Sequence, residues 1–371
     1  MPGATSALSR RTALFDEHVA LGADMRAYAW AGMAMPWSYR TSVAAEQRAV
    51  RERCGLTDAS QLQVVSVCGP GAVACMERLV PRRIGDLPVG ASRFSVVLSR
   101  FGRICDEALI MRLDEREFWI SHGCGATRAQ LGKIVDAADV RVTPRGDTHV
   151  LALQGPSSLQ VLSRAANLDL ADLPFLGHRR VSLRGRPVVV SRTGFTGELG
   201  FEIFCDAEDA VMLWRLLQAT GGPVGLTPYG YRCVDLLRIE AGFLLYPVDL
   251  SMAGSLREAG LAWLVRDKVA DYVGRDKVER ASGSVTHRFA GVRLRGALEV
   301  ARGAGLRRGE REIGVVTSSA FSPASGDTLC IARVEQEALQ DDAQVDVAST
   351  PNGVGRLVAL PHRARRGGAR L

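Results

Sequence analysis

The chain has 371 residues, more than one hydrophobic core usually holds, so two or three domains are expected. Hydrophobic residues make up 47% of it and charged residues 23%, which is typical of a soluble globular protein, and no run of about 18 apolar residues predicts a membrane span. The net charge is +7, and nearly all of the positive charge comes from arginines spread along the chain. The chain has no basic stripe interleaved with aromatic residues, so nucleic-acid binding is not expected.

The cysteines and the N-terminus indicate a cytoplasmic protein. The eight cysteines form no C-x-x-C pair and have no histidine at metal-ligand spacing, so we expect free thiols in a reducing compartment and no metal site. Met1 to Arg11 lacks the apolar core of a secretory signal, and a disordered start is expected there.

Helices and short strands alternate along the first 280 residues, which predicts an α+β fold. Residues 10–60 are expected to be mostly helical, with one helix opening at Leu14 and another from Ser42 to Cys54. Further strands are predicted at 62–67, 94–98, 108–113, 117–121 and 149–153, and further helices at 69–79, 126–138, 156–165, 207–219 and 229–240.

A glycine-rich stretch between two strands is the most distinctive local feature. A β-run at 181–191 leads into Arg192-Thr193-Gly194-Phe195-Thr196-Gly197-Glu198-Leu199-Gly200, and a second strand then carries Glu202. Glycines allow a backbone to approach a ligand closely, and alternation along the strand gives Glu202 one defined face. The pattern predicts a binding loop with a carboxylate beside it.

The composition changes near residue 280. The stretch Arg280 to Val285 is a plausible linker, and short strands follow at 289–292, 312–317, 328–334 and 344–347. We therefore expect residues 1–280 to form one α+β region and residues 286–371 a separate all-β domain.

Several segments in the same order resemble the glycine cleavage T-protein (aminomethyltransferase) family, as does the glycine-rich stretch itself. They lie at 11–25, 35–39, 54–60, 102–107, 235–242 and 313–323. The resemblance covers almost the whole chain. It implies three domains around a central folate cavity, with two intertwined α+β subdomains in the first region and a C-terminal β-barrel, and with tetrahydrofolate as the cofactor.

The resemblance also implies the residues that carry the chemistry. Glu202 would accept two N–H groups from the pterin, or alternatively is a strand carboxylate that faces water. Asp106 and Glu107 are neighbours on a strand and face opposite sides, so only one reaches the folate, and alignment favours Glu107; alternatively both cap the preceding turn. His122 stands where the family has an amide and could protonate a leaving group, or simply pack in the wall. Tyr246 matches a family tyrosine near the cavity and could equally be an ordinary buried tyrosine.

Other side chains are expected to line the folate or to support the frame. The candidate lining residues are Leu62, Tyr39, Phe175, Phe195 and Arg238. Aromatic residues at such spacings are more often simply core, and Arg238, Glu240 and Glu198 are also interpreted as structural residues.

Departures from the family pattern at several polar positions favour a diverged member. The leading hypothesis is a tetrahydrofolate-dependent methyltransferase or demethylase acting on a small O-, S- or N-methylated molecule. The alternatives are the glycine-cleavage aminomethyltransferase, whose partner would be a lipoyl carrier protein, and a folate-binding protein without catalysis.

Overall fold

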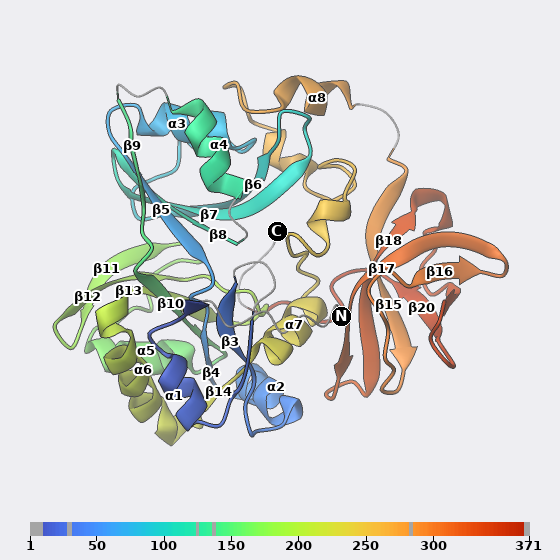
Figure 1. The fold of residues 1–371 in the computed structure, drawn as a ribbon, viewed down its shortest axis with the longest axis horizontal. Helices are drawn as coiled ribbons and strands as arrows, with labels where there is room; N and C mark the ends of the chain where they lie inside the picture. The colour runs from blue at the N-terminus through green and yellow to red at the C-terminus, as the bar shows by residue number, and fades with distance from the viewer. Residues whose placement is uncertain (1–9, 28–31, 124–125, 136–138, 282–284, 367–371) are drawn as a thin grey trace.

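The structure is a computed structural model that describes residues 10–27, 32–123, 126–135, 139–281 and 285–366. Two layered α/β units stand on one side of the molecule and a closed barrel on the other, with helix α7 (Tyr231–Glu240) between them (Figure 1). The predicted α+β class with a C-terminal barrel is confirmed.

The first unit is a six-stranded sheet in the order β11-β12-β13-β10-β4-β14. Helices α5 and α6 cover one face, where leucine, valine and isoleucine side chains pack around Trp214. The bounds are β4 Gly55–Asp58, β10 Thr148–Gln154, α5 Ser158–Ala166, β11 His178–Leu183, β12 Arg186–Ser191, β13 Gly200–Asp206, α6 Ala207–Gly221, η1 Gly222–Val224 and β14 Thr227–Pro228.

The second unit is a five-stranded sheet in the order β6-β7-β8-β5-β9, with helices α3 and α4 on its outer face. The bounds are β5 Gln63–Cys68, α3 Ala72–Leu79, β6 Ser92–Leu98, β7 Ile104–Asp114, β8 Glu117–His122, α4 Ala126–Ile134 and β9 Arg141–Pro144.

The inner faces of the two sheets pack against each other. Val64, Met111 and Trp119 from the second sheet form one buried cluster with Val150 and Phe204 from the first. Burial of apolar surface at about 25 cal/mol per Å² holds the layers together.

A small sheet, β1-β3-β2, and several short helices complete the first region. The bounds are β1 Arg10–Arg11, α1 Phe15–Ala20, β2 Asp24–Ala27, β3 Met33–Ser38, α2 Val43–Glu52, η2 Leu250–Met252, η3 Ala262–Val265 and α8 Arg275–Arg280.

The C-terminal barrel closes in the order β15-β18-β17-β16-β19-β20 around its own apolar core. The bounds are β15 His287–Arg295, β16 Gly305–Arg308, β17 Arg311–Ser322, β18 Asp327–Glu335, η4 Gln336–Ala338, β19 Gln344–Val347 and β20 Val354–Val358. The segment that follows returns to the first region, where the Arg366 N–H donates to the carbonyl of Gly197 at 2.7 Å.

Two predictions of secondary structure are wrong. Residues 10–60 are not mostly helical, because strands β1 to β4 lie there, and their short runs do not alternate clearly between polar and apolar residues. The β-run at 181–191 is instead part of a hairpin, in which Arg184 and Gly185 both have positive φ, as a two-residue turn requires. The end of the helix predicted at 126–138 and the middle of the predicted linker lie outside the described residues.

Candidate active site

Glu202 projects from the inner face of the first sheet. On β13 it lies opposite Ala152 of β10 and Ser191 of β12, and Phe204 two residues on packs in the inter-sheet cluster. The Thr193 hydroxyl donates a 2.5 Å hydrogen bond to Glu202 Oε2. Burial raises the pKa of the Glu202 carboxyl, and the Thr193 hydrogen bond opposes this rise.

The glycine-rich turn wraps around a protein side chain. A Cβ on Gly194 or Gly200 would overlap the amide of Gln154. Gln154 Nε2 donates to the Thr193 carbonyl at 3.2 Å, and the Thr196 hydroxyl donates to Gln154 Oε1 at 2.8 Å. These two glycines therefore make room for Gln154, and they also line the small cavity beside the turn; close approach of their backbone to a ligand stays a prediction.

Aromatic rings lie beside the turn. Phe195 stacks on Phe243 with 5.3 Å between ring centroids, and the Arg365 guanidinium lies 4.4 Å from the Phe243 centroid. Arg365 Nε donates to the carbonyl of Ala241 at 2.8 Å. Phe175, Phe243 and the turn line a cavity of about 10 Å³, so the turn forms one wall of a small aromatic niche.

Glu107 projects from the inner face of the second sheet. It lies on β7 opposite Val96, and Leu109 two residues on packs against the inter-sheet cluster. Its Oε1 accepts a 2.9 Å hydrogen bond from the backbone N–H of Tyr246. Burial raises the pKa of Glu107 to about 8, so the carboxyl group is largely protonated at pH 7.

Asp106 faces the opposite side of the same strand. Its Oδ2 accepts hydrogen bonds from the Thr127 N–H at 3.1 Å and the Thr127 hydroxyl at 2.7 Å, at the start of α4. Burial acts to raise the pKa of Asp106, but hydrogen bonds from His122 and Thr127 outweigh it and the pKa is lowered. Asp106 is therefore an ionised anchor under α4.

His122 shares the face of Asp106. Its Nδ1 lies 3.0 Å from Asp106 Oδ2, and the residue opposite it on β7 is Ala108, which packs in the outer core. Within the described part of the chain, its Nε2 is buried without a hydrogen-bond partner. The register therefore places His122 on the face opposite to Glu107, and we assign it no proton transfer to substrate.

Tyr39 belongs to a buried chain of hydrogen bonds. Its hydroxyl lies 2.9 Å from His18 Nδ1, and His18 Nε2 lies 3.1 Å from Asp58 Oδ2. The side chains of His18 and Asp58 are completely buried. The rings of His18 and Trp214 form a T-shaped pair with 5.0 Å between their centroids. Tyr39 thus helps to fix the N-terminal segment to β4.

Arg238 is 1% exposed and fully engaged by protein groups. It donates to Asp249 at 2.6 Å, to Asp235 at 2.7 Å and to the Ser318 hydroxyl at 2.6 Å. These contacts join α7 to the barrel and match the structural interpretation of Arg238 rather than a free ligand contact. Leu62 is half-buried against the inter-sheet cluster.

Three residues around the turn carry no motif that would have marked them. Thr193 was visible in the glycine-rich stretch but looks like a turn residue until its bond to Glu202 is known. Gln154 ends a buried strand, and Arg365 lies at the far end of the chain. Only the fold brings all three together.

Glu107 and Glu202 therefore project from the two inner faces that pack on each other. Each has a pKa raised by burial, yet each side chain keeps an intermediate exposure. Both carboxyl groups are therefore largely surrounded by protein while part of each side chain remains accessible to solvent.

The matches to known proteins extend over both parts of this fold. Residues 14–268 match the GCVT N-terminal domain, and residues 287–357 match the glycine cleavage T-protein C-terminal barrel domain. The chain belongs to the glycine cleavage T-protein family. The resemblance expected from the sequence motifs is confirmed.

Relatives of this T-protein family member align over nearly their whole length. The heme-dependent oxidative N-demethylase gamma subunit of Ectopseudomonas mendocina is 33% identical over 361 residues, 95% of each chain. The aminomethyltransferase of Halothermothrix orenii is 30% identical over 357 residues, 95% of this chain and 99% of the relative. The aminomethyltransferase of Streptomyces coelicolor is 35% identical over 335 residues, 88% and 89% respectively.

A solved T-protein has the same architecture. The glycine cleavage system aminomethyltransferase T from Bartonella henselae superposes with a TM-score of 0.86 at 27% identity, covering 96% of this chain and 99% of that one. The similarity spans the sheets and the barrel together, so the whole arrangement is that of the family.

The described residues offer neither a metal-binding cluster nor a membrane-spanning helix. Among these residues, no group of three or more His, Cys, Asp and Glu side chains is placed to hold a metal ion. Over the same residues, every helix is too short or too polar to cross a membrane. The cysteines of this part of the chain are free thiols, five of them buried; Cys124 lies outside it.

Proposed function

We propose that this chain transfers a one-carbon unit to tetrahydrofolate, by the aminomethyl type of reaction. The observation that carries the proposal is the pair Glu107 and Glu202 on facing inner surfaces, one largely protonated at pH 7 and one an acceptor. Relatives called aminomethyltransferases at 30% and 35% identity support this donor class over the methylated small molecule favoured by the sequence alone.

The residues present suit a reduced pterin. Glu202 is paired with a neutral hydroxyl, and within the described residues no arginine or lysine forms an ion pair with it. A buried carboxylate without a cation suits a ligand edge with two N–H donors, which gives a bidentate, charge-assisted contact. Phe195 and Phe175 would lie beside the ring system.

When bound, tetrahydrofolate would supply two N–H nitrogens that bond to the carbon transferred from an aminomethyl thioether. The bonds that join this carbon to the sulfur and the nitrogen of the donor would break. The two protons complete the products, a thiol and ammonia, so no oxidant is needed. Glu202 would orient the acceptor. Glu107 would deliver a proton to the departing nitrogen, stabilise positive charge at the reacting centre as a carboxylate, and then regain a proton from the reacting folate nitrogen.

The donor would be carried on a lipoyl arm of a partner protein. The test is incubation of the purified chain with tetrahydrofolate and an aminomethylated lipoyl carrier protein, followed by mass spectrometry of the folate. Formation of 5,10-methylene-tetrahydrofolate with release of ammonia is expected. A chain that binds tetrahydrofolate but produces none of this product would refute the aminomethyl reaction.

A second candidate is a demethylase role, favoured by the 33% identity to the oxidative N-demethylase gamma subunit over 95% of both chains. In a direct methyl transfer, which unlike an oxidative demethylation needs no oxidant, the methyl group moves to folate and the folate proton goes to the leaving heteroatom, so the product is 5-methyl-tetrahydrofolate. A panel of O-, S- and N-methylated donors separates the candidates by product mass. Folate binding without turnover of any donor would favour a non-catalytic folate-binding protein.

A further inference from the structure

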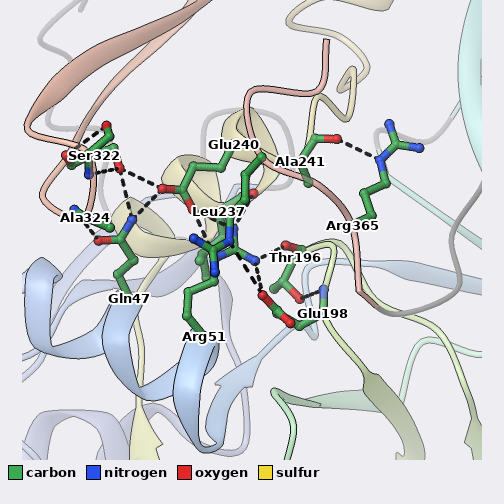
Figure 2. A network of polar contacts seen from close by, with 12 residues as sticks. Gln47, Arg51, Thr196, Glu198, Leu237, Glu240, Ala241, Ser322, Ala324 and Arg365 are labelled. Carbon is green, nitrogen blue, oxygen red and sulfur yellow. Dashed lines mark hydrogen bonds and ion pairs between the residues drawn. The ribbon is translucent and has the colours of Figure 1, made fainter. Parts of the chain in front are cut away.

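A buried polar network lies behind the glycine-rich turn and joins it to the barrel (Figure 2). At its centre is Arg51 of α2, which is 5% exposed. The labelled residues come from α2, the turn, α7, the barrel and the C-terminal segment, which are far apart in the sequence. The network therefore connects α2, α7, the barrel and the C-terminal segment to the turn.

Arg51 binds the turn through two acceptors. Its Nη1 donates to the Thr196 carbonyl at 2.7 Å and to Glu198 Oε1 at 3.0 Å. On the inner side of the turn, Gln154 bonds the Thr193 carbonyl and the Thr196 hydroxyl. Arg51 and Gln154 thus both hold the turn. Thr193, near the start of the turn, is the residue that donates a hydrogen bond to Glu202.

The other nitrogens of Arg51 bind α7. Nε and Nη2 donate to Glu240 Oε2 at 3.0 and 2.6 Å, and Nη2 also reaches the Leu237 carbonyl at 3.3 Å. Glu240 Oε1 accepts from Gln47 at 2.6 Å and from the Ser322 hydroxyl of the barrel at 2.7 Å. One carboxylate therefore connects the barrel to the guanidinium that holds the turn.

The C-terminal segment brings a second arginine to the cluster. Glu198 and Glu240 carry two negative charges beside Arg51, and Arg363 Nε lies 4.0 Å from Glu198 Oε1. Buried charges are costly unless they are paired, so this arrangement keeps the turn in one position. A lysine at position 51 would keep the charge but lose the planar fork that reaches both acceptors at once.

We propose that Arg51 is a positioning residue for reduced-folate binding: by fixing the turn at Thr196 and Glu198 it sets the place of Thr193, and through Thr193 that of Glu202. This inference rests on the proposed function. Arg51 is not itself a contact of the ligand, because its donors are bonded to protein acceptors. Its influence must therefore pass through Glu202, which makes the proposal testable by coupling.

The experiment is a double-mutant cycle read by calorimetric titration with tetrahydrofolate under argon. R51K in the wild-type background is expected to weaken binding by about tenfold, roughly the net loss of one charge-assisted hydrogen bond. In an E202Q background the same change is expected to have less than about a twofold effect, because the contact it positions is already impaired.

The control is R333K in the barrel, where Arg333 binds Glu258 through Nε and Nη2 at 3.3 and 3.0 Å. It removes a comparable fork from a residue remote from the turn, and folate affinity is expected to stay unchanged. If R51K does not fold, E198Q replaces it, because it removes the negative charge from one acceptor of Arg51 and so weakens that ion pair; about threefold weaker binding, again suppressed by E202Q, is expected.

The outcomes separate the two proposals. If the wild-type chain does not bind tetrahydrofolate, the proposed function fails. If the wild type binds but R51K and E198Q bind equally well, or weaken binding to the same extent with and without E202Q, then Arg51 is an ordinary structural residue and the inference is overturned.

Discussion

Asp106 and Glu107 are adjacent on one strand, yet they face opposite sides of the sheet and have pKa values shifted in opposite directions. Asp106 receives hydrogen bonds from His122 and Thr127 that stabilise its charge. Glu107 receives a single backbone hydrogen bond in a buried setting, so its neutral form is favoured. One strand therefore provides an ionised structural carboxylate and a proton-bearing carboxyl group.

E107Q is expected to lower kcat by about 10²-fold or more, the usual contribution of a positioned proton donor. With the pKa of Glu107 raised to about 8, wild-type kcat is expected to fall as pH rises through that value. E107Q should lack this limb. The check is a pH–rate profile of both proteins with tetrahydrofolate saturating; an unchanged profile in E107Q would contradict the role.

The same shift predicts a stability effect. The folded pKa of Glu107 lies above its ordinary value of 4.5, so the folded state binds this proton more tightly and stability falls as pH rises from about 4.5 to about 8. E107Q removes this loss. Denaturant titrations at pH 5 and pH 9 are expected to show E107Q gaining stability over wild type mainly at pH 9.

E202A is expected to weaken tetrahydrofolate binding by about 10- to 100-fold, because a buried charge-assisted contact is lost. Calorimetry measures it, with E115A at an exposed turn as the control. Since burial raises the pKa of Glu202, wild-type affinity should also decline with acidification at a pH above the ordinary range of a glutamate. Equal affinities for E202A and wild type would exclude the pterin contact.

H122Q is expected to change kcat by less than about threefold and to leave the pH–rate profile intact, because His122 lies on the face opposite to Glu107 and bonds Asp106. The substitution should instead lower the free energy of unfolding, because the buried carboxylate of Asp106 loses its imidazole partner. Kinetics and thermal unfolding on one preparation test both. If H122Q lost a pKa from the pH–rate profile, the imidazole of His122 would take part in catalysis and the prediction would be wrong.

D58N is expected to destabilise the fold by about 3 kcal/mol, the scale of weakening buried hydrogen bonds to a charged carboxylate. Burial acts to raise the pKa of Asp58, but the hydrogen bond from His18 outweighs it and the pKa is lowered. This contribution is therefore present above pH 3.8 and lost as pH falls through the lowered value. Urea titrations should show the gap between D58N and wild type closing in acid.

Much of the architecture follows from the sequence. Long periodic helices such as α6 and the β-rich C-terminus were predictable because their patterns are strong. Strands such as β4 were not, because a four-residue strand buried on both faces shows no alternation. The division into a 1–280 region and a 286–371 domain stays a prediction.

The candidate site was predictable in part. The opposite facing of Asp106 and Glu107 follows from the strand period alone. The face of His122 depends on the register between β7 and β8, which no local pattern encodes. The interactions of Gln154 and Arg51 with the glycine-rich turn join residues some 40 and 145 positions apart, so only the folded chain reveals them.

The return of the C-terminal segment to the turn has a practical consequence. Arg363 N–H donates to the Glu240 carbonyl and Arg366 N–H to the Gly197 carbonyl, at 2.8 and 2.7 Å. Only five residues would separate the second of these bonds from a purification tag fused after Leu371. Recombinant protein for affinity measurements should therefore carry its tag at the opposite end, or have a C-terminal tag cleaved before titration.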